Sequence, residues 1–275
     1  MGEPEIDDAA LEGIGRALER ASGLALADGL RERLREALAL AAEELRVRPP
    51  ALARAVIAGE PGALELLAEH AVVAETHFWR QPEGLLALAA LLAPLPRPLA
   101  LWSAGCATGE EPYGLAIALL EAGRAGRGDR ILATDLSARA LARARAGRYG
   151  ARALRHLPPA LAARWLVAGD GGAGAGEPPG GGAARVDDRV RALVEFERHG
   201  LLEPPPGGGF DAVVCRNVLI YFERPAAVAA LARLLGSVRP GGFLVTGPVE
   251  LALAAGLAAE AVEVGGATLL RRPAH

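Results

Sequence analysis

The chain has 275 residues, of which 51% are hydrophobic and 23% charged, and its formal net charge is −3 at pH 7. This composition is typical of a globular protein with one large domain or two unequal ones, and it excludes a disordered chain. The small net charge gives no indication of nucleic-acid binding. No uninterrupted apolar run of about 18 residues is present, so we expect no membrane insertion.

The two cysteines, Cys106 and Cys215, lie far apart in apolar segments. They are too few and too widely spaced for a disulfide scaffold or a zinc site, so we expect no metal. The first residues, MGEPEIDDAALEG, are acidic and have no apolar core, and therefore predict no signal peptide. A cytoplasmic protein is the resulting expectation.

Residues 1–72 show only helical patterns and are predicted to form a small helical N-terminal domain. In LADGLRERLREALALAAEELRVRPP the leucines recur near helical spacing, with Asp28 as a candidate N-cap and Pro49 as a stop. Two shorter helical runs follow, separated by a Gly-Glu-Pro-Gly break.

Residues 73–275 alternate between strand and helix patterns. The predicted strands are 98–102, 130–135, 210–217 and 241–247, and the predicted helices are 112–121, 137–149 and 225–238. AVEVGGATLLRR near the end reads as a hairpin. This order predicts an α/β fold with a doubly wound, mostly parallel sheet and a C-terminal antiparallel hairpin. Residues 168–184, rich in Gly, Pro and Ala, are expected to form a flexible loop.

In such a sheet, ligands bind where the strands end. The loop Ser103–Glu111 follows the first strand, and it has neither the spacing of a dinucleotide loop nor the lysine of a P-loop. Its small residues, including Gly105, allow a ligand to approach the backbone closely. Glu110 and Glu111 would oppose a phosphate, although they could also simply cap the next helix.

Asp135 ends the second strand, where an acidic residue usually binds ribose hydroxyls, although such an Asp is often only a helix cap. Taken together, the loop and the acids favour a cationic nucleoside without phosphates, which is S-adenosylmethionine, with S-adenosylhomocysteine as the product. Arg216, Asn217 and Tyr221 follow the third strand. Arg216 could instead form a surface salt bridge, Tyr221 could be a core residue, and ETHFWRQPEG could be a hydrophobic hinge.

Six segments together resemble the chemotaxis-receptor (CheR-type) glutamate methyltransferases. They are THFWRQP, LWSAGCATGEEPYGLAIAL, ATDLSARALARARAGRY, VEF with a following LL, FDAVVCRNVLIYF and RPGGFLVTGPVE. The resemblance covers nearly the whole chain, because SGLALADGLRERLREAL is similar to the helical N-terminal domain of the family. It implies a Rossmann-like class I methyltransferase that forms methyl esters on glutamates of a protein substrate, the cytoplasmic coiled coil of a chemoreceptor. We expect a monomer.

The resemblance also implies a role for individual residues. Arg80 would lie near the transferred methyl and Tyr221 would face the acceptor carboxylate, so these two are the predicted catalytic residues. The predicted cofactor-binding residues are Thr76, Arg80, Gly105, Glu111, Asp135, Leu201, Cys215, Arg216 and Asn217. A glutamate acceptor is already ionised at neutral pH and needs no general base, so positioning is the main task of the site and His77 and His199 are expected to be bystanders.

The sequence departs from the family pattern at a few positions. Ala74, Gly200 and Pro248-Val249 replace polar residues of the family, and each change could remove a hydrogen bond of about 0.5–1.5 kcal/mol. The Gly/Pro-rich stretch occupies much of the span of a small β-subdomain, so tethering to a receptor tail is not expected. Two alternatives stay open: a cofactor-binding sensor or scaffold with little catalysis, or a methyltransferase for a different carboxylate acceptor.

Overall fold

The computed structural model describes residues 6–22, 30–71, 76–168 and 184–274. The chain divides into two compact units, one made of Met1–Ala74 with Leu219–Ala227 and the other of Glu75–Val218 with Val228–His275. The predicted cap Asp28 and most of the predicted loop 168–184 lie outside the described residues. The domain boundary between residues 72 and 73 stays a prediction.

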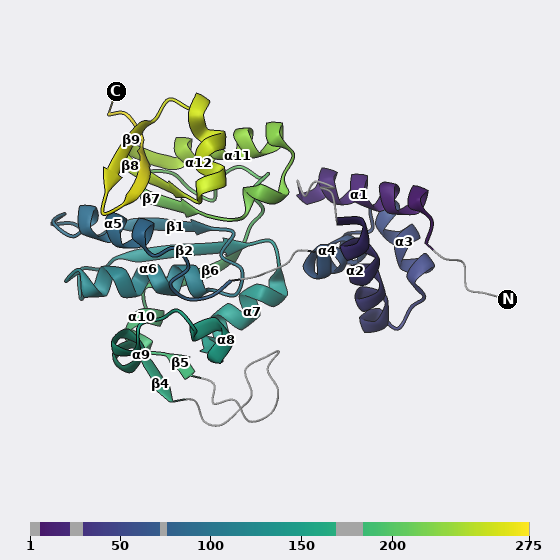
Figure 1. The fold of residues 1–275 in the computed structure, drawn as a ribbon, viewed down its shortest axis with the longest axis horizontal. Coiled ribbons are helices and arrows are strands. Elements are labelled where there is room, and N and C mark those ends of the chain that lie inside the picture. The colour runs from purple at the N-terminus through teal and green to yellow at the C-terminus, as the bar shows by residue number, and fades with distance from the viewer. Residues whose placement is uncertain (1–5, 23–29, 72–75, 169–183, 275) are drawn as a thin grey trace. The chain divides into compact units, whose positions relative to one another are not determined.

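The first unit contains the helical region that the sequence predicts (Figure 1). Its helices are α1 Asp8–Ser22, α2 Leu30–Leu45, α3 Pro49–Ile57 and α4 Pro61–Ala71. They enclose a hydrophobic core of their own, which includes Leu11, Ile14, Leu34, Leu38, Leu52 and Leu67. Pro49 was predicted to stop the preceding helix, and it is also the first residue of α3. Proline is tolerated there because it lacks an N–H, and the N–H groups of the first helical turn have no partner within the helix. Among the described residues, every helix is too short or too polar to cross a bilayer.

The second unit is built on a seven-stranded sheet with the order β6-β2-β1-β7-β8-β10-β9. The strands are β1 Ala100–Ala104, β2 Arg130–Asp135, β6 Val194–Arg198, β7 Phe210–Cys215, β8 Val238–Thr246, β9 Glu260–Val264 and β10 Ala267–Arg271. The first five strands of this order pair in parallel, whereas β10 pairs antiparallel with both β8 and β9. The predicted α/β fold with a mostly parallel sheet and a C-terminal hairpin is confirmed.

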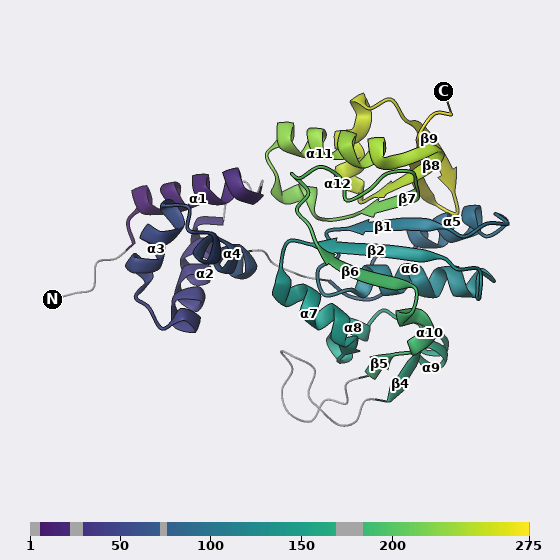
Figure 2. The ribbon, with the colours of Figure 1, turned by 180° about the vertical axis from the view of Figure 1, so that it is seen from behind.

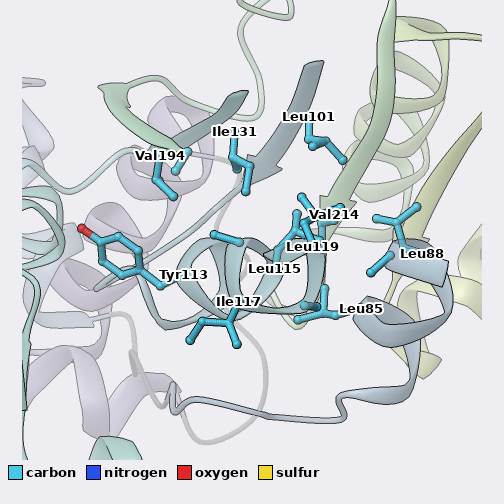
Figure 3. Close-up of a cluster of buried hydrophobic side chains, with 14 of the residues drawn as sticks. Leu85, Leu88, Leu101, Tyr113, Leu115, Ile117, Leu119, Ile131, Val194 and Val214 are labelled. Atoms are coloured by element: carbon cyan, nitrogen blue, oxygen red, sulfur yellow. The ribbon is translucent and has the colours of Figure 1, made fainter. Parts of the chain in front are cut away.

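Helices cover this sheet and bury its apolar side chains. They are α5 Glu83–Leu92, α6 Glu110–Glu121, α7 Ala138–Ala146, α11 Arg224–Ser237 and α12 Pro248–Leu253, with the short 3-10 helix η2 Ala254–Gly256. A further 3-10 helix, η1 Leu219–Tyr221, belongs to the first unit. Figures 1 and 2 show α5 and α6 together on one face. Leu85 and Leu88 of α5 and Leu115 of α6 pack with Ile131 and Val214 of the strands (Figure 3). This core fixes the start of α6 against the ends of β1 and β7.

The strand order creates a switch point between β1 and β7. From β1 the chain proceeds to β2 and β6 on one side, and it then returns to β7 and β8 on the other side. The chain therefore leaves the carboxyl ends of β1 and β7 toward opposite sides of the sheet, and the general rule for open sheets of this kind places the ligand crevice at this point.

A second, three-stranded sheet is a feature that the sequence did not predict. It has the order β3-β5-β4, with β3 Arg148–Tyr149, β5 Ala184–Val186 and β4 Leu166–Ala168, and with the short helices α8 Ala151–Leu154, α9 Pro159–Trp165 and α10 Asp188–Arg191 around it. Ala168 and Ala184, expected as the two ends of a flexible loop, are instead paired across β4 and β5. That expectation was wrong at both ends, because backbone pairing needs no particular side chain and leaves no strong pattern in the sequence.

Candidate active site

The loop between β1 and α6 lies at the switch point and is held close to both neighbouring strands. The N–H groups of Gly105 and Cys106 donate to the Thr134 carbonyl of β2 at 2.8 and 2.9 Å. Gly105 has a φ of +79°, and a Cβ there would approach Cγ2 of Val218, just after β7, to 2.7 Å. Only glycine fits this approach without strain. The structure thus gives Gly105 a definite role in shaping the crevice; its contact with a cofactor stays a prediction.

Asp135, at the carboxyl end of β2, organises the same loop. One carboxylate oxygen accepts the N–H of Ala107 at 2.8 Å, and the other accepts the N–H of Ser137 at 2.9 Å. Ala107 has a φ of +47°, a conformation that a non-glycine residue adopts only when its surroundings hold it. Ser137 caps α7 as predicted, because its side chain accepts the N–H of Ala140 at 3.0 Å.

Glu111 and Arg216 form a buried ion pair across the crevice. Arg216 Nε donates to Glu111 Oε2 at 2.8 Å, and the side chains are 5% and 13% exposed respectively. The other carboxylate oxygen of Glu111 accepts the Ser103 hydroxyl at 2.9 Å. Arg216 therefore does not form a surface salt bridge, which was one alternative for it. Glu111 is likewise more than a helix cap.

Glu110 is buried and joins two segments that are distant in the sequence. The hydroxyl of Thr108 donates to its Oε2 at 2.7 Å, and the hydroxyl of Thr76 also hydrogen-bonds its carboxylate. Burial raises the pKa of Glu110 above its ordinary value, although both hydroxyl hydrogen bonds act in the opposite direction. It is the first residue of α6, as expected. Its bond to Thr76 was not anticipated.

The segment Thr76–Pro82 is packed tightly within the second unit. Phe78 is fully buried, its N–H donates to Ala153 O at 2.9 Å, and its ring meets Tyr149 edge-on at 4.8 Å between centroids. Trp79 and Gln81 have φ values of +62° and +47°, which are unusual for such large residues. Backbone strain of this kind clusters at functional sites. The segment therefore has a fixed, strained backbone, and its part in the functional site stays a prediction.

The turn after β7 forms the opposite wall. Cys215 is fully buried, and Asn217 has a φ of +57°. The next N–H, of Val218, donates to Oε1 of the fully buried Glu250 at 3.0 Å. Gly247 lies so close that a Cβ there would come within 2.5 Å of the Glu250 carboxylate. The block Gly247–Glu250 thus contacts the turn after β7 through Glu250, although Pro248 and Val249 differ from the family pattern.

The structure connects most of the predicted site residues but not all of them. Direct bonds or close contacts join the segments that carry Thr76, Arg80, Gly105, Glu111, Asp135 and Arg216. Cys215 and Asn217 lie beside Arg216 in the chain, and Asn217 is close to Gly247. Leu201 is attached through its carbonyl, which accepts from Arg233 Nη2 at 3.2 Å, and the replaced position Gly200 donates to Glu203. Tyr221 is half-buried in η1, which belongs to the first unit, so its place facing the acceptor stays a prediction.

The titratable groups that could act as a base are engaged elsewhere. Burial raises the pKa of Cys106 and of Cys215 well above the ordinary thiol value. Arg155 contacts His77 Nδ1 at 2.9 Å, and His199 Nε2 bonds the Pro204 carbonyl at 2.7 Å. No group of His, Cys, Asp and Glu within the described ranges could hold a metal ion.

The residues present fit a cationic nucleoside. Carboxylates from α6 and β2 stand at the switch point, the loop beside them is made of small residues, and the walls are apolar. These groups suit an ammonium or sulfonium centre and ribose hydroxyls, and the carboxylates would repel a phosphate.

Residues 74–257 match the family model described as CheR methyltransferase, SAM binding domain. The chain belongs to the CheR methyltransferase family. Its cofactor is accordingly S-adenosylmethionine, and it is a methyltransferase that uses this cofactor. The family resemblance seen in the sequence is confirmed.

Curated relatives agree with this assignment. The chain is 37% identical over 197 residues to chemotaxis protein methyltransferase 2 of Pseudomonas aeruginosa, covering 70% of this chain and 68% of the relative. It is 32% identical over 257 residues to the chemotaxis protein methyltransferase of Vibrio parahaemolyticus, covering 89% and 90%. A probable biofilm formation methyltransferase, WspC, of Pseudomonas aeruginosa is 36% identical over 204 residues, but the match spans only 46% of that longer protein.

Sequence reasoning missed the functions of two acids. Glu110 was expected only to start a helix, and Glu250 was not assigned a role. For Glu250 a signal was available, because it is the single carboxylate in the apolar stretch FLVTGPVELAL, and a charge in such a stretch is rarely buried without a partner.

Proposed function

We propose that this methyltransferase transfers the methyl group to glutamate side chains of a chemoreceptor-like protein. The observation that carries the proposal is the buried link from Glu111 through Arg216 to the backbone of Arg80, because it ties the candidate cofactor carboxylate to the candidate catalytic arginine. The relatives named as chemotaxis methyltransferases support the same acceptor class. The cytoplasmic location and the monomeric state remain predictions.

The acid–base character of the site supports a carboxylate acceptor. An amine or hydroxyl acceptor must lose a proton, whereas a glutamate side chain, with an ordinary pKa of about 4.3, is already ionised at neutral pH. The cysteine thiols stay protonated because burial raises their pKa, and the carboxylates Glu110 and Glu111 are held by hydroxyl and guanidinium partners. A site of this kind suits a reaction that depends on positioning rather than on proton transfer.

The cofactor, when bound, supplies an electrophilic methyl group on a sulfonium. In the proposed roles Glu111 and Asp135 bind its amino group and ribose, and the walls around Phe78 and Cys215 exclude water. Arg80 and Tyr221 orient the acceptor carboxylate, since a guanidinium and a phenol hydroxyl both donate hydrogen bonds to carboxylate oxygen. With the acceptor carboxylate held in this way, its oxygen would take the methyl group and leave S-adenosylhomocysteine, and the product would be a methyl ester.

The test is transfer of radiolabelled methyl from the cofactor to purified chemoreceptor cytoplasmic fragments. We expect label that is released by mild base, as methyl esters are, and that falls at least 100-fold for Arg80→Ala and at least 10-fold for Tyr221→Phe. Arg130→Ala, an exposed arginine with 76% of its side chain accessible, is the matched control and should leave the rate unchanged.

Each other outcome has a definite meaning. Tight binding of S-adenosylhomocysteine without transfer to any acceptor would support a sensor or scaffold. Base-labile label on a different carboxylate would keep the enzyme and change its substrate. Base-stable label would contradict ester formation.

A further inference from the structure

We propose that Arg216 is a positioning residue, which holds the segment carrying Thr76 and Arg80 in the geometry that methyl transfer needs. The inference rests on the proposed function and assigns to Arg216 a task different from lining the cofactor pocket. Arg216 lies immediately after β7, whereas the segment it binds lies more than 130 residues earlier in the chain.

The guanidinium uses all three of its nitrogens on parts of the protein. Nε donates to Glu111 Oε2 at 2.8 Å, Nη1 donates to the Gln81 carbonyl at 2.7 Å, and Nη2 donates to the Arg80 carbonyl at 2.8 Å. The planar guanidinium spreads its donors over three nitrogens in a fixed fork, whereas the three N–H donors of a lysine ammonium all leave from one nitrogen and cannot reach the same three acceptors in this geometry. The residue is only 9% exposed, so these charge-assisted bonds are little weakened by water.

The two carbonyls belong to a strained stretch of backbone. Trp79 and Gln81 both have positive φ values, and each would relax toward the ordinary region if nothing held it. Arg216 binds the carbonyls of Arg80, which lies between the two strained residues, and of Gln81 itself. It therefore stabilises the conformation that places the Arg80 side chain.

The other half of the segment has separate attachments. Thr76 bonds to Glu110, and the Phe78 N–H bonds to Ala153 O at 2.9 Å. Loss of Arg216 should therefore loosen the Arg80 end while the Phe78 end stays in place. This pattern differs from general unfolding and can be measured.

The experiment uses Arg216→Lys in the full chain, with Arg239→Lys as the matched control. Arg239 also pairs with a buried carboxylate, Asp211, and donates to a carbonyl, that of Gly209, but it does so at the amino end of β7, away from the site. Both variants are compared with wild type by hydrogen exchange of peptides covering 76–86, by calorimetry with S-adenosylhomocysteine, and by methyl transfer to receptor fragments.

For Arg216→Lys we expect amide exchange in residues 79–81 to rise at least fivefold, and kcat to fall 10- to 100-fold with a smaller loss of S-adenosylhomocysteine affinity. Arg239→Lys should change none of these by more than twofold. Glu111→Gln removes the ion pair but keeps the two carbonyl bonds, so exchange in residues 79–81 should change less than twofold.

Unchanged exchange in Arg216→Lys would overturn the proposal, as would an equal rise in Glu111→Gln, since the ion pair rather than the fork would then hold the segment. A loss of S-adenosylhomocysteine affinity larger than the loss of kcat would make Arg216 a direct ligand instead. The exchange measurement needs no acceptor, so failure of the proposed glutamate methylation would appear separately, as an absence of transfer by wild type.

Discussion

Asp135 accepts the backbone N–H of Ala107 at 2.8 Å, and so the acid that ends β2 sets the conformation of the loop that follows β1. Its second oxygen accepts the N–H of Ser137 at the start of α7. A carboxylate that was predicted from its position to bind ribose therefore also builds the wall of its own pocket. If Asp135 binds the cofactor as predicted, a change at this residue alters the loop and the binding together.

Asp135→Asn is expected to weaken S-adenosylhomocysteine binding at least tenfold. The side-chain NH2 of the asparagine would replace one of the two oxygens that accept the N–H groups of Ala107 and Ser137. One of these N–H groups would then lose its acceptor, at a cost of about 1–3 kcal/mol. Calorimetry measures the change. Asp188→Asn, on a carboxylate with 74% exposure that pairs with Arg185, is the control. An unchanged dissociation constant for Asp135→Asn would separate Asp135 from the cofactor.

Gly109→Ala is expected to lower both stability and cofactor affinity, because its φ is +95° and a Cβ would lie 2.8 Å from the Tyr149 hydroxyl. Gly123 has a φ of +81° but no atom within 4 Å of its Cβ position, so Gly123→Ala shows the backbone strain alone, about 1 kcal/mol. The Gly109 variant should lose a further ~1–3 kcal/mol through the clash. Urea unfolding measures the free energy of unfolding of both variants. Equal losses would mean that the loop around Gly109 shifts to accommodate the new Cβ without cost, which would contradict the prediction.

Glu110→Gln gives a prediction about pH. Burial raises the pKa of Glu110, so the folded protein holds this proton more tightly than the unfolded chain does. The resulting contribution to stability is fully present below the ordinary glutamate pKa and is lost as pH rises through the raised, folded-state value. The stability of wild type minus that of the variant should therefore fall as pH rises from about 4.3, the ordinary glutamate pKa, through the raised pKa of the folded protein. Urea midpoints at several pH values test this, and a flat or rising difference would contradict it.

The pair of Arg124 and Asp129 predicts a large stability effect away from the site. Both side chains are 1% exposed and are joined by two bonds of 2.6 Å, and Arg124 also donates to the carbonyls of Leu92, Leu95 and Arg97. Asp129→Ala would leave a buried guanidinium without its counter-ion, at a cost of about 3–5 kcal/mol. Glu195→Ala breaks the exposed pair with Arg130 and should cost at most about 1 kcal/mol. Thermal unfolding measures both, and a similar loss in each would be the contrary result.

The local parts of the fold could be predicted because their causes lie within a few residues. Ser137 caps α7 through the N–H of Ala140, three positions away, and the Gly265-Gly266 pair closes the β9–β10 hairpin with two positive φ values. By contrast, β6 is a short strand with mixed exposure, and β4 and β5 have three residues each. Their patterns are too short to separate from loops, and only pairing with a neighbour defines them.

The candidate site also has features that the sequence predicts and features that only the structure shows. The sequence alone determined the family, the cofactor class and the position of Glu111, Asp135 and Arg216 at strand and helix ends, because strand–loop–helix order dictates which edge of a parallel sheet these residues reach. Only the tertiary structure decided what they bind. That Arg216 holds the carbonyls of Arg80 and Gln81, and that Glu110 bonds Thr76, depends on contacts between segments far apart in the chain, and such contacts arise from packing around the switch point rather than from any local pattern.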